Sequence, residues 1–161
     1  MIEAPAKALA REVLDQPRDP DLVELYQLWL AKRRGRLMPS RSDFDPSEFC
    51  KLLPSIQLYD VGPVEGTYKV RLVGGALVET AGRNNTGKPP GYGLPEADGR
   101  SIVEILNAVV RRRAPLFGRG RVHWITGKTY RKYEGCVLPL SDDGASVNMI
   151  LCALNFEPRG A

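Results

Sequence analysis

The sequence predicts an α+β domain with an antiparallel sheet, and two observations lead to it. The predicted strands come in runs that helices separate, without the strict strand–helix alternation that parallel sheets require. The composition is globular, because 43% of the 161 residues are hydrophobic and 26% are charged. No apolar run is long enough to span a membrane, and the N-terminus lacks an apolar secretion signal, so we expect a cytoplasmic protein.

The predicted domain opens with an amphipathic helix. Residues 1–18 contain two prolines and no clear pattern, which predicts a loose N-terminal arm before a single domain over 19–161. Asp19 and Pro20 are typical of a helix start, and the helix is expected over 19–34. The apolar stripe of this helix contains Leu22, Leu25, Tyr26, Trp29 and Leu30.

A short helix and a β-hairpin follow. Asp45 and Glu48 stand at the spacing of a capping box and predict a short helix that Pro54 stops. The segments Ser55–Val61 and Thr67–Val73 are rich in β-branched and aromatic residues. The Gly- and Pro-containing turn between these two segments predicts a hairpin.

The second half of the chain predicts one longer helix and three strands. Residues 84–100 contain four glycines and three prolines, so we expect a long loop there. Ser101 and Glu104 form a second capping box, which predicts a helix that ends at about Arg113. Strands are expected over Leu116–Ile125, Thr129–Leu140 and Ala145–Phe156.

The last predicted strand is apolar on both faces between Met149 and Leu154. This pattern is typical of a central strand that is covered on both sides. We expect one cover to be the layer of helices and loops, and the other to be the helix over 19–34 or a second subunit. Because an isolated amphipathic helix must bury its stripe, we also expect a homodimer with that stripe at a two-fold interface.

The sequence supplies no convincing catalytic site. Gly82–Lys88 matches the phosphate-loop spacing G-x-x-x-x-G-K, but Pro89 stands where Ser or Thr and a helix N-terminus are needed, so a turn is favoured. Asp142 and Asp143 lie in a four-residue turn and are expected to form it rather than act as an acid–base pair. One histidine and three cysteines without a C-x-x-C pair favour neither a metal site nor an enzyme.

Positive charge is concentrated in one part of the chain. Residues 105–133 contain eight of the 23 basic residues and no acid, which leaves 15 basic residues against all 19 acids elsewhere. Two interpretations remain open, a solvated surface or a surface that binds an acidic partner, an anion or nucleic acid. The residues of this basic surface are Arg111, Arg112, Arg113, Arg119, Arg121 and Arg131.

Four stretches of the sequence resemble one family. They are YQLWLAKRRGRLMPSRSDFDP (26–46), LLPSIQLYDV (52–61), YKVRLVGGALVETAGRNNTGK (68–88) and LPLSDDG (138–144). The first stretch matches the run W-x-x-x-R-x-G-R-x-M-P-x-R-x-D-x-D-P, which is the specific part of the likeness. On these residues the chain resembles a bacterial family of stand-alone PAS-like domain proteins over about 19–156.

The resemblance implies a five-stranded antiparallel sheet of strand order 2-1-5-4-3, with helices on one face that enclose a small pocket. Relatives that bind haem take a histidine from the helix before the third strand, and that helix contains none here. Flavin photochemistry in related light sensors needs a cysteine after the second strand, and residues 76–84 contain none. Haem, flavin and metal are therefore not favoured, and the resemblance names no cofactor.

The resemblance implies sensing or binding rather than catalysis. We expect a non-catalytic sensory or regulatory module of signal transduction that binds a small ligand, a protein partner or both, without a membrane partner. The alternative is a basic nucleic-acid or anion-binding adaptor that uses the surface over 105–133. The ligand pocket, if present, is expected to be lined by Tyr59, Arg71, Leu77, Arg83, Trp124, Leu138 and Asn148.

Overall fold

The computed structural model describes residues 11–122 and 131–157. The helical elements are α1 (Pro20–Lys32), the 3₁₀ segments η2 (Arg41–Asp43) and η3 (Pro46–Ser55), α2 (Gly75–Ala81) and α3 (Glu96–Arg112). The strands are β1 (Arg11–Leu14), β2 (Ile56–Val61), β3 (Tyr68–Val73), β4 (Leu116–Val122), β5 (Arg131–Leu140) and β6 (Met149–Phe156).

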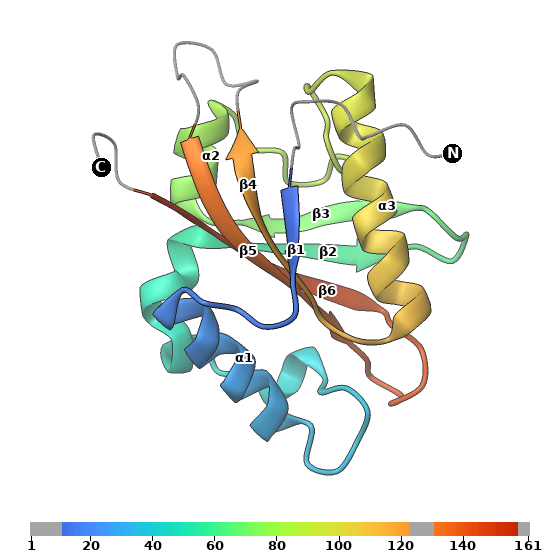
Figure 1. The fold of residues 1–161 in the computed structure, drawn as a ribbon. Coiled ribbons are helices and arrows are strands. Elements are labelled where there is room, and N and C mark those ends of the chain that lie inside the picture. Colours follow the sequence, from blue (N-terminus) through green and yellow to red (C-terminus); the bar gives the residue numbers. More distant parts are fainter. Residues whose placement is uncertain (1–10, 123–130, 158–161) are drawn as a thin grey trace.

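The strands form one antiparallel sheet of order β1-β4-β5-β6-β2-β3 (Figure 1). The five strands from β2 to β6 have the order that the family resemblance implied, with β6 at the centre. The sixth strand, β1, pairs with β4 at the edge of the sheet. Residues 11–14 were expected in a loose arm, but Leu14 lies opposite Phe117 and is buried there.

The α1 helix covers one face of the sheet, which we call the outer face. The ring of Tyr26 meets the ring of Phe117 edge-on, with 4.8 Å between their centroids. The indole nitrogen of Trp29 donates a hydrogen bond of 2.9 Å to the backbone carbonyl of Pro139 in β5. Residues of the outer face, which alternate along the strands with those of the opposite face, include Phe117, Cys136, Leu138, Ala153 and Ile56.

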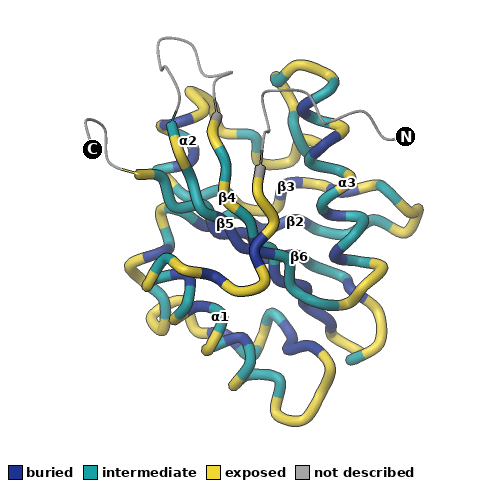
Figure 2. The backbone as a smooth tube through the Cα atoms, viewed as in Figure 1, coloured by how far each residue is buried: buried dark blue, intermediate teal, exposed yellow. Residues whose placement is uncertain are grey.

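The α2 and α3 helices lie against the opposite, inner face. The hydroxyl of Tyr68 in β3 donates a hydrogen bond of 2.5 Å to the side chain of Asn107 in α3. Leu106 and Val109 of α3 are fully buried, and so is Ile150 at the centre of the sheet. Figure 2 shows the buried residues gathered in the middle strands and along the sheet-facing side of the helices. The central strand β6 is therefore covered on both faces, as its apolar pattern predicted.

Local capping explains where α1 begins and ends. The carboxylate of Asp19 accepts hydrogen bonds from the backbone N–H groups of Asp21 and Leu22, at 2.9 and 3.3 Å. After the last turn, Arg36 donates to the carbonyl of Lys32 at 2.9 Å and so satisfies an unpaired helix end. Gly35, just beyond the end of α1, has a φ of 82°, a left-handed conformation that glycine adopts without strain.

Several boundaries differ from the sequence-based expectation. The segment η3 runs to Ser55 and contains Pro54, the residue that was expected to stop it. The α3 helix begins at Glu96, and Ser101, the expected cap, is buried inside it and donates to the carbonyl of Ala97. Pro95 precedes the first turn, where Glu96 and Asp98 suit the positive end of the helix dipole. The last strand begins at Met149, because the preceding residues form a turn. No helix in the described ranges is long and apolar enough to cross a membrane.

Candidate functional site: the outer face of the sheet

The residues expected to line a ligand pocket do not surround one cavity. Tyr59 is buried on the inner face, where burial raises the pKa of its hydroxyl, and Leu77 is buried in α2. Arg71 is exposed and lies 3.6 Å from the carboxylate of Asp60. It is the extra residue of a β-bulge, because Leu58 pairs with Leu72 while Tyr59 pairs with Val70.

The other expected pocket residues lie elsewhere in the fold. Arg83 is exposed beyond the end of α2, and Leu138 is buried on the outer face beneath α1. The side-chain oxygen of Asn148 accepts the backbone N–H of Asp142 at 2.8 Å, so this amide serves the turn before β6. Trp124 lies outside the described residues. The four principal hollows within the described ranges are lined by none of these side chains.

The structure divides the predicted basic surface among three places. At the end of α3, Arg111 pairs with Glu65 at 2.7 Å and Arg113 donates to the carbonyl of Ala145. Arg112 is exposed beside them. On the outer face, Arg119 pairs with Glu12 of β1 at 2.8 Å, and Arg121 lies two residues further along β4.

The third place is the inner face, where Arg131 is turned toward α2. Its guanidinium donates to the hydroxyl of Thr80 at 3.3 Å and lies 5.0 Å from the centre of the Phe156 ring. The Nε of Arg131 is buried and has no hydrogen-bond partner in the described part of the chain. The six arginines therefore do not share one face.

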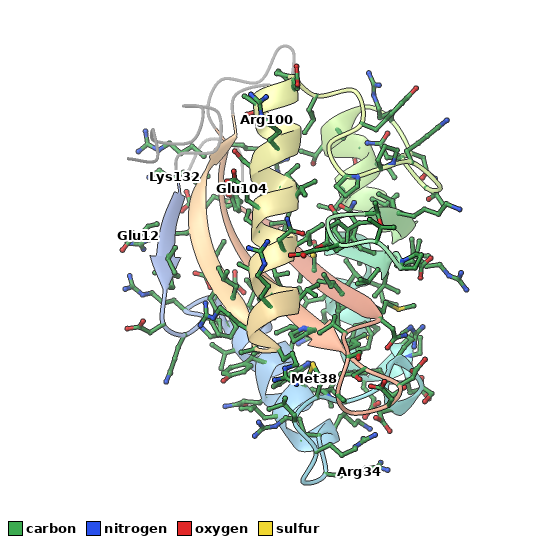
Figure 3. The ribbon with its side chains drawn as sticks, turned by 90° about the vertical axis from the view of Figure 1, so that its right-hand side faces the viewer. Glu12, Arg34, Met38, Arg100, Glu104 and Lys132 are labelled. Atoms are coloured by element: carbon green, nitrogen blue, oxygen red, sulfur yellow. The ribbon has the colours of Figure 1, made fainter. Side chains whose placement is uncertain are left out.

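The largest of the four principal hollows lies on the outer face, beyond the N-terminal end of α1, and has a volume of about 1,120 Å³. Its floor is the part of β4, β5 and β6 that α1 does not cover. Figure 3 shows Glu12 and Lys132 on the β1 side of the molecule, to the left of α3 in this view. The lining comprises Glu12, Arg18, Asp19, Arg119, Gly120, Arg121, Lys132, Tyr133, Glu134, Asn155, Phe156 and Glu157.

Most acids in this hollow are engaged by the fold. Glu12 pairs with Arg119, which is the main reason that the pKa of Glu12 lies below its usual range. One carboxylate oxygen of Glu134 accepts the backbone N–H groups of Arg18 and Asp19, each at 2.8 Å. The other oxygen of the Asp19 cap accepts the side-chain amide of Asn155 at 2.9 Å.

Two cations in the hollow stand apart from these pairs. Arg121 and Lys132 are directly opposite each other in the β4–β5 register, are exposed, and form no ion pair within the described ranges. Both cations belong to the basic stretch predicted over 105–133, although only Arg121 was among the six residues named for the basic surface. Glu12, Glu134 and Asn155 were not predicted as site residues. The period-two alternation along β5 was the available signal, because it places Lys132 and Glu134 on one face.

The segments that carry the family resemblance meet in space and have a structural role. The hydroxyl of Ser40 donates to the carboxylate of Asp142 at 2.7 Å, and the N–H of Ser141 donates to the carbonyl of Pro39 at 2.9 Å. Met38, beside them, is fully buried. Asp143 accepts the N–H groups of the residues after Gly144, as its interpretation as a turn former predicted.

The described residues offer little for covalent chemistry or metal binding. Burial raises the pKa of Cys136 to about 12 and raises that of Cys152 as well, so neither thiol is ionised near neutral pH. No group of three metal-binding side chains comes together in these ranges. Gly82 ends α2, and Gly87 and Lys88 hydrogen-bond to Val70 at the edge of β3, so this segment forms a turn along the sheet.

The comparisons with known proteins agree with this architecture. A family model described as "PAS domain" matches residues 18–155. This chain belongs to the PAS domain family. Domains of this family are generally sensory or regulatory modules. No curated protein sequence matches the chain.

Solved structures with a similar fold include other PAS and LOV domains. The PAS domain of BvgS from Bordetella pertussis is 21% identical, with a TM-score of 0.49, and the match covers 73% of this chain and 90% of that one. A LOV protein from Rhodobacter sphaeroides is 13% identical, with a TM-score of 0.48 over 73% and 71% of the two chains. An RNA-binding LOV receptor is 11% identical, with a TM-score of 0.50, and the match covers 95% of this chain and 39% of that receptor.

Proposed function

We propose that this PAS domain is a non-catalytic regulatory module that acts by binding a signalling protein. The observation that carries the proposal is the position of free space in the fold. On the inner face Tyr59, Ile150, Leu106 and Val109 are buried, whereas the largest of the four principal hollows opens on the outer face. An open, charged surface of this size suits a protein partner better than an enclosed small molecule.

The absence of catalysis is part of this proposal. The Asp142 and Asp143 carboxylates, which form the obvious acidic pair, are both engaged in the turn before β6. The buried thiols of Cys136 and Cys152 have raised pKa values and are shielded from substrates. An acyl- or phosphoryl-transfer site that works through a covalent intermediate needs a nucleophile beside a general base. The contacts of the described residues include no such pair.

The experiment combines affinity purification from the native host with reconstitution. Proteins that co-purify with the tagged full chain are identified, expressed separately and titrated against it by calorimetry. We expect one of them to bind with fixed stoichiometry, and native mass spectrometry to give the mass of the chain without a retained small molecule. A small molecule retained in a fixed ratio, with no protein that binds on reconstitution, would contradict the proposal.

A small-molecule ligand on the inner face is the second candidate function. Arg131 favours it, because the Nε of this guanidinium is buried without a hydrogen-bond partner in the described part of the chain. The guanidinium also donates to the hydroxyl of Thr80 and lies over the Phe156 ring. The native mass measurement decides between the two candidates, since an anionic ligand held by Arg131 would be lost from an Arg131→Ala variant.

The apolar stripe of α1 leaves less exposed surface for the expected homodimer than the sequence suggested. Leu22, Leu25 and Trp29 are buried against the chain's own sheet, and only Tyr26 and Leu30 of the stripe remain partly exposed. A dimer through α1 would therefore rest on a small apolar contact. Sedimentation velocity at tens of micromolar tests it, because a monomer there would exclude a dimer of ordinary cellular affinity.

A further inference from the structure

We propose that the outer hollow binds an acidic segment of the partner protein, with partner carboxylates paired to Arg121 and Lys132. The inference rests on the proposed function and names the chemistry of the partner. The proposed binding site also differs from the continuous basic surface expected over 105–133, because it consists of two of those cations and the walls of the hollow around them.

The placement of the two cations is the first argument. Arg121 of β4 and Lys132 of β5 are directly opposite in the sheet, so both side chains project to the outer face. Like charges in this cross-strand position repel each other and destabilise the pair of strands. A carboxylate bound between them removes that repulsion and gains two charge-assisted hydrogen bonds.

The second argument is the state of the other charges. Arg119 is paired with Glu12. Glu134 accepts hydrogen bonds from the backbone N–H groups of Arg18 and Asp19, where the chain enters α1. The carboxylate of Asp19 accepts one from the side-chain amide of Asn155 in β6. Glu157, at the end of β6, is the remaining acid of the lining. Arg18 is exposed and also lines the hollow, so it adds a third cation there. Its charge contributes to the lowered pKa of Glu12.

Size and sign select the occupant. The hollow has a volume of about 1,120 Å³ and is open to solvent, so it can admit a segment of polypeptide. A nucleic-acid backbone carries a charge at every nucleotide and would bring phosphates against Glu12, Glu134 and Glu157. An acidic peptide can place its carboxylates at the two cations alone. Residues 1–10 and 158–161 contain a single acid, Glu3, so neither stretch is an acidic segment of this kind.

The test uses the full chain and a fluorescein-labelled peptide with three glutamates separated by serines, measured by fluorescence anisotropy. We expect binding that weakens between 50 and 200 mM salt, because salt screens exposed charges. The R121E/K132E variant should lose at least about tenfold in affinity, since it places like charges across the contact. The R121Q/K132Q variant should lose less, because it removes attraction without adding repulsion.

The matched control is K51E/R112E, which makes the same change in net charge at two exposed residues outside the hollow. This control should bind the glutamate peptide within about twofold of the unchanged chain. All variants are compared by circular dichroism and thermal unfolding, and the exposed positions of Arg121 and Lys132 predict unchanged folding. An equal loss in R121E/K132E and in the control would overturn the inference, because binding would then follow net charge alone.

Two further arms separate the alternatives. A labelled single-stranded RNA of the same charge should bind more weakly than the peptide, and tighter RNA binding that R121E/K132E abolishes would overturn the inference in favour of nucleic acid. The identified host partner is then titrated against R121E/K132E. Undiminished binding would refute the acidic contact while leaving the regulatory function in place, whereas the absence of any protein partner would refute the function itself.

Discussion

The carboxylate of Glu134 in β5 holds the backbone N–H of Asp19, 2.8 Å away, at the point where the chain enters α1. A second bond of 2.8 Å to the N–H of Arg18 shares the same oxygen. Asn155 completes the contact by donating to the Asp19 side chain that caps the helix. The start of α1 is therefore fixed to the two central strands of the sheet, directly beside the outer hollow.

This contact predicts that Glu134→Ala destabilises the fold. The substitution leaves two N–H groups without their acceptor, which costs about 1–2 kcal/mol in the free energy of unfolding, measured with urea. Glu134→Gln should cost less, because an amide oxygen still accepts both bonds. An Ala variant as stable as the unchanged chain would show that water replaces the carboxylate at no cost.

The bond between Trp29 and Pro139 makes a second prediction about the α1 cover. Trp29→Phe retains an aromatic ring but leaves the carbonyl of Pro139 without its donor in a buried place, and we expect a loss of about 1–3 kcal/mol in unfolding free energy. Tyr26→Phe is the control, because it keeps the ring contact with Phe117 and should cost under about 0.5 kcal/mol. Equal effects of the two substitutions would exclude a special role for the indole bond.

The order of the elements along the chain could be predicted because its signals are local, whereas the order of the strands in the sheet was implied by the family resemblance. The caps at Asp19 and Asp45 and the two-sided apolar pattern of β6 are each readable within a few residues. The strand β1 was missed because four residues are too few to show a period. The start of α3 was missed because Pro95 precedes it inside a segment rich in glycine and proline.

The candidate site could be predicted only in part, because it depends on which face each strand residue occupies. A shift of one residue moves a side chain to the other face of a sheet. The bulge at Arg71 introduces such a shift in β3. Leu138 is two residues from Cys136 in β5, so both side chains lie on the outer face beneath α1. The hollow also requires Glu12, Arg121 and Lys132 to meet from three strands, and no local pattern in the sequence reports that meeting.

Cysteine reactivity provides a third prediction. Cys50 is exposed on η3, whereas Cys136 and Cys152 are buried and their pKa values are raised by burial. At pH 8 the folded chain should release one equivalent of thionitrobenzoate from Ellman's reagent rapidly, and three after denaturation. A Cys50→Ser variant should show no fast equivalent. Two or more fast equivalents in the folded chain would contradict the placement of the other two thiols.

The capping box of η3 predicts how stability changes in acid. The pKa of Asp45 is lowered mainly by the N–H of Ser47, and that of Glu48 mainly by the N–H of Asp45 and then by Lys32. Because both carboxyls have lower pKa values folded than unfolded, the unfolded chain binds more protons in acid. Their stabilisation is therefore present above about pH 4, the ordinary range of free carboxyls, and is lost as the pH falls through the lowered folded values.

Urea unfolding at pH 6 and at pH 3.5 measures this dependence. We expect the unchanged chain to be less stable at the lower pH, and a Glu48→Gln variant to lose less between the two, because one of the titrating caps is gone. Asp21→Asn is the matched control, since this carboxyl lies in the first turn of α1, outside the capping box of η3. If Glu48→Gln and the unchanged chain fall by the same amount, the Glu48 carboxylate does not carry the acid sensitivity, and the contact with Lys32 at 2.9 Å adds nothing to it.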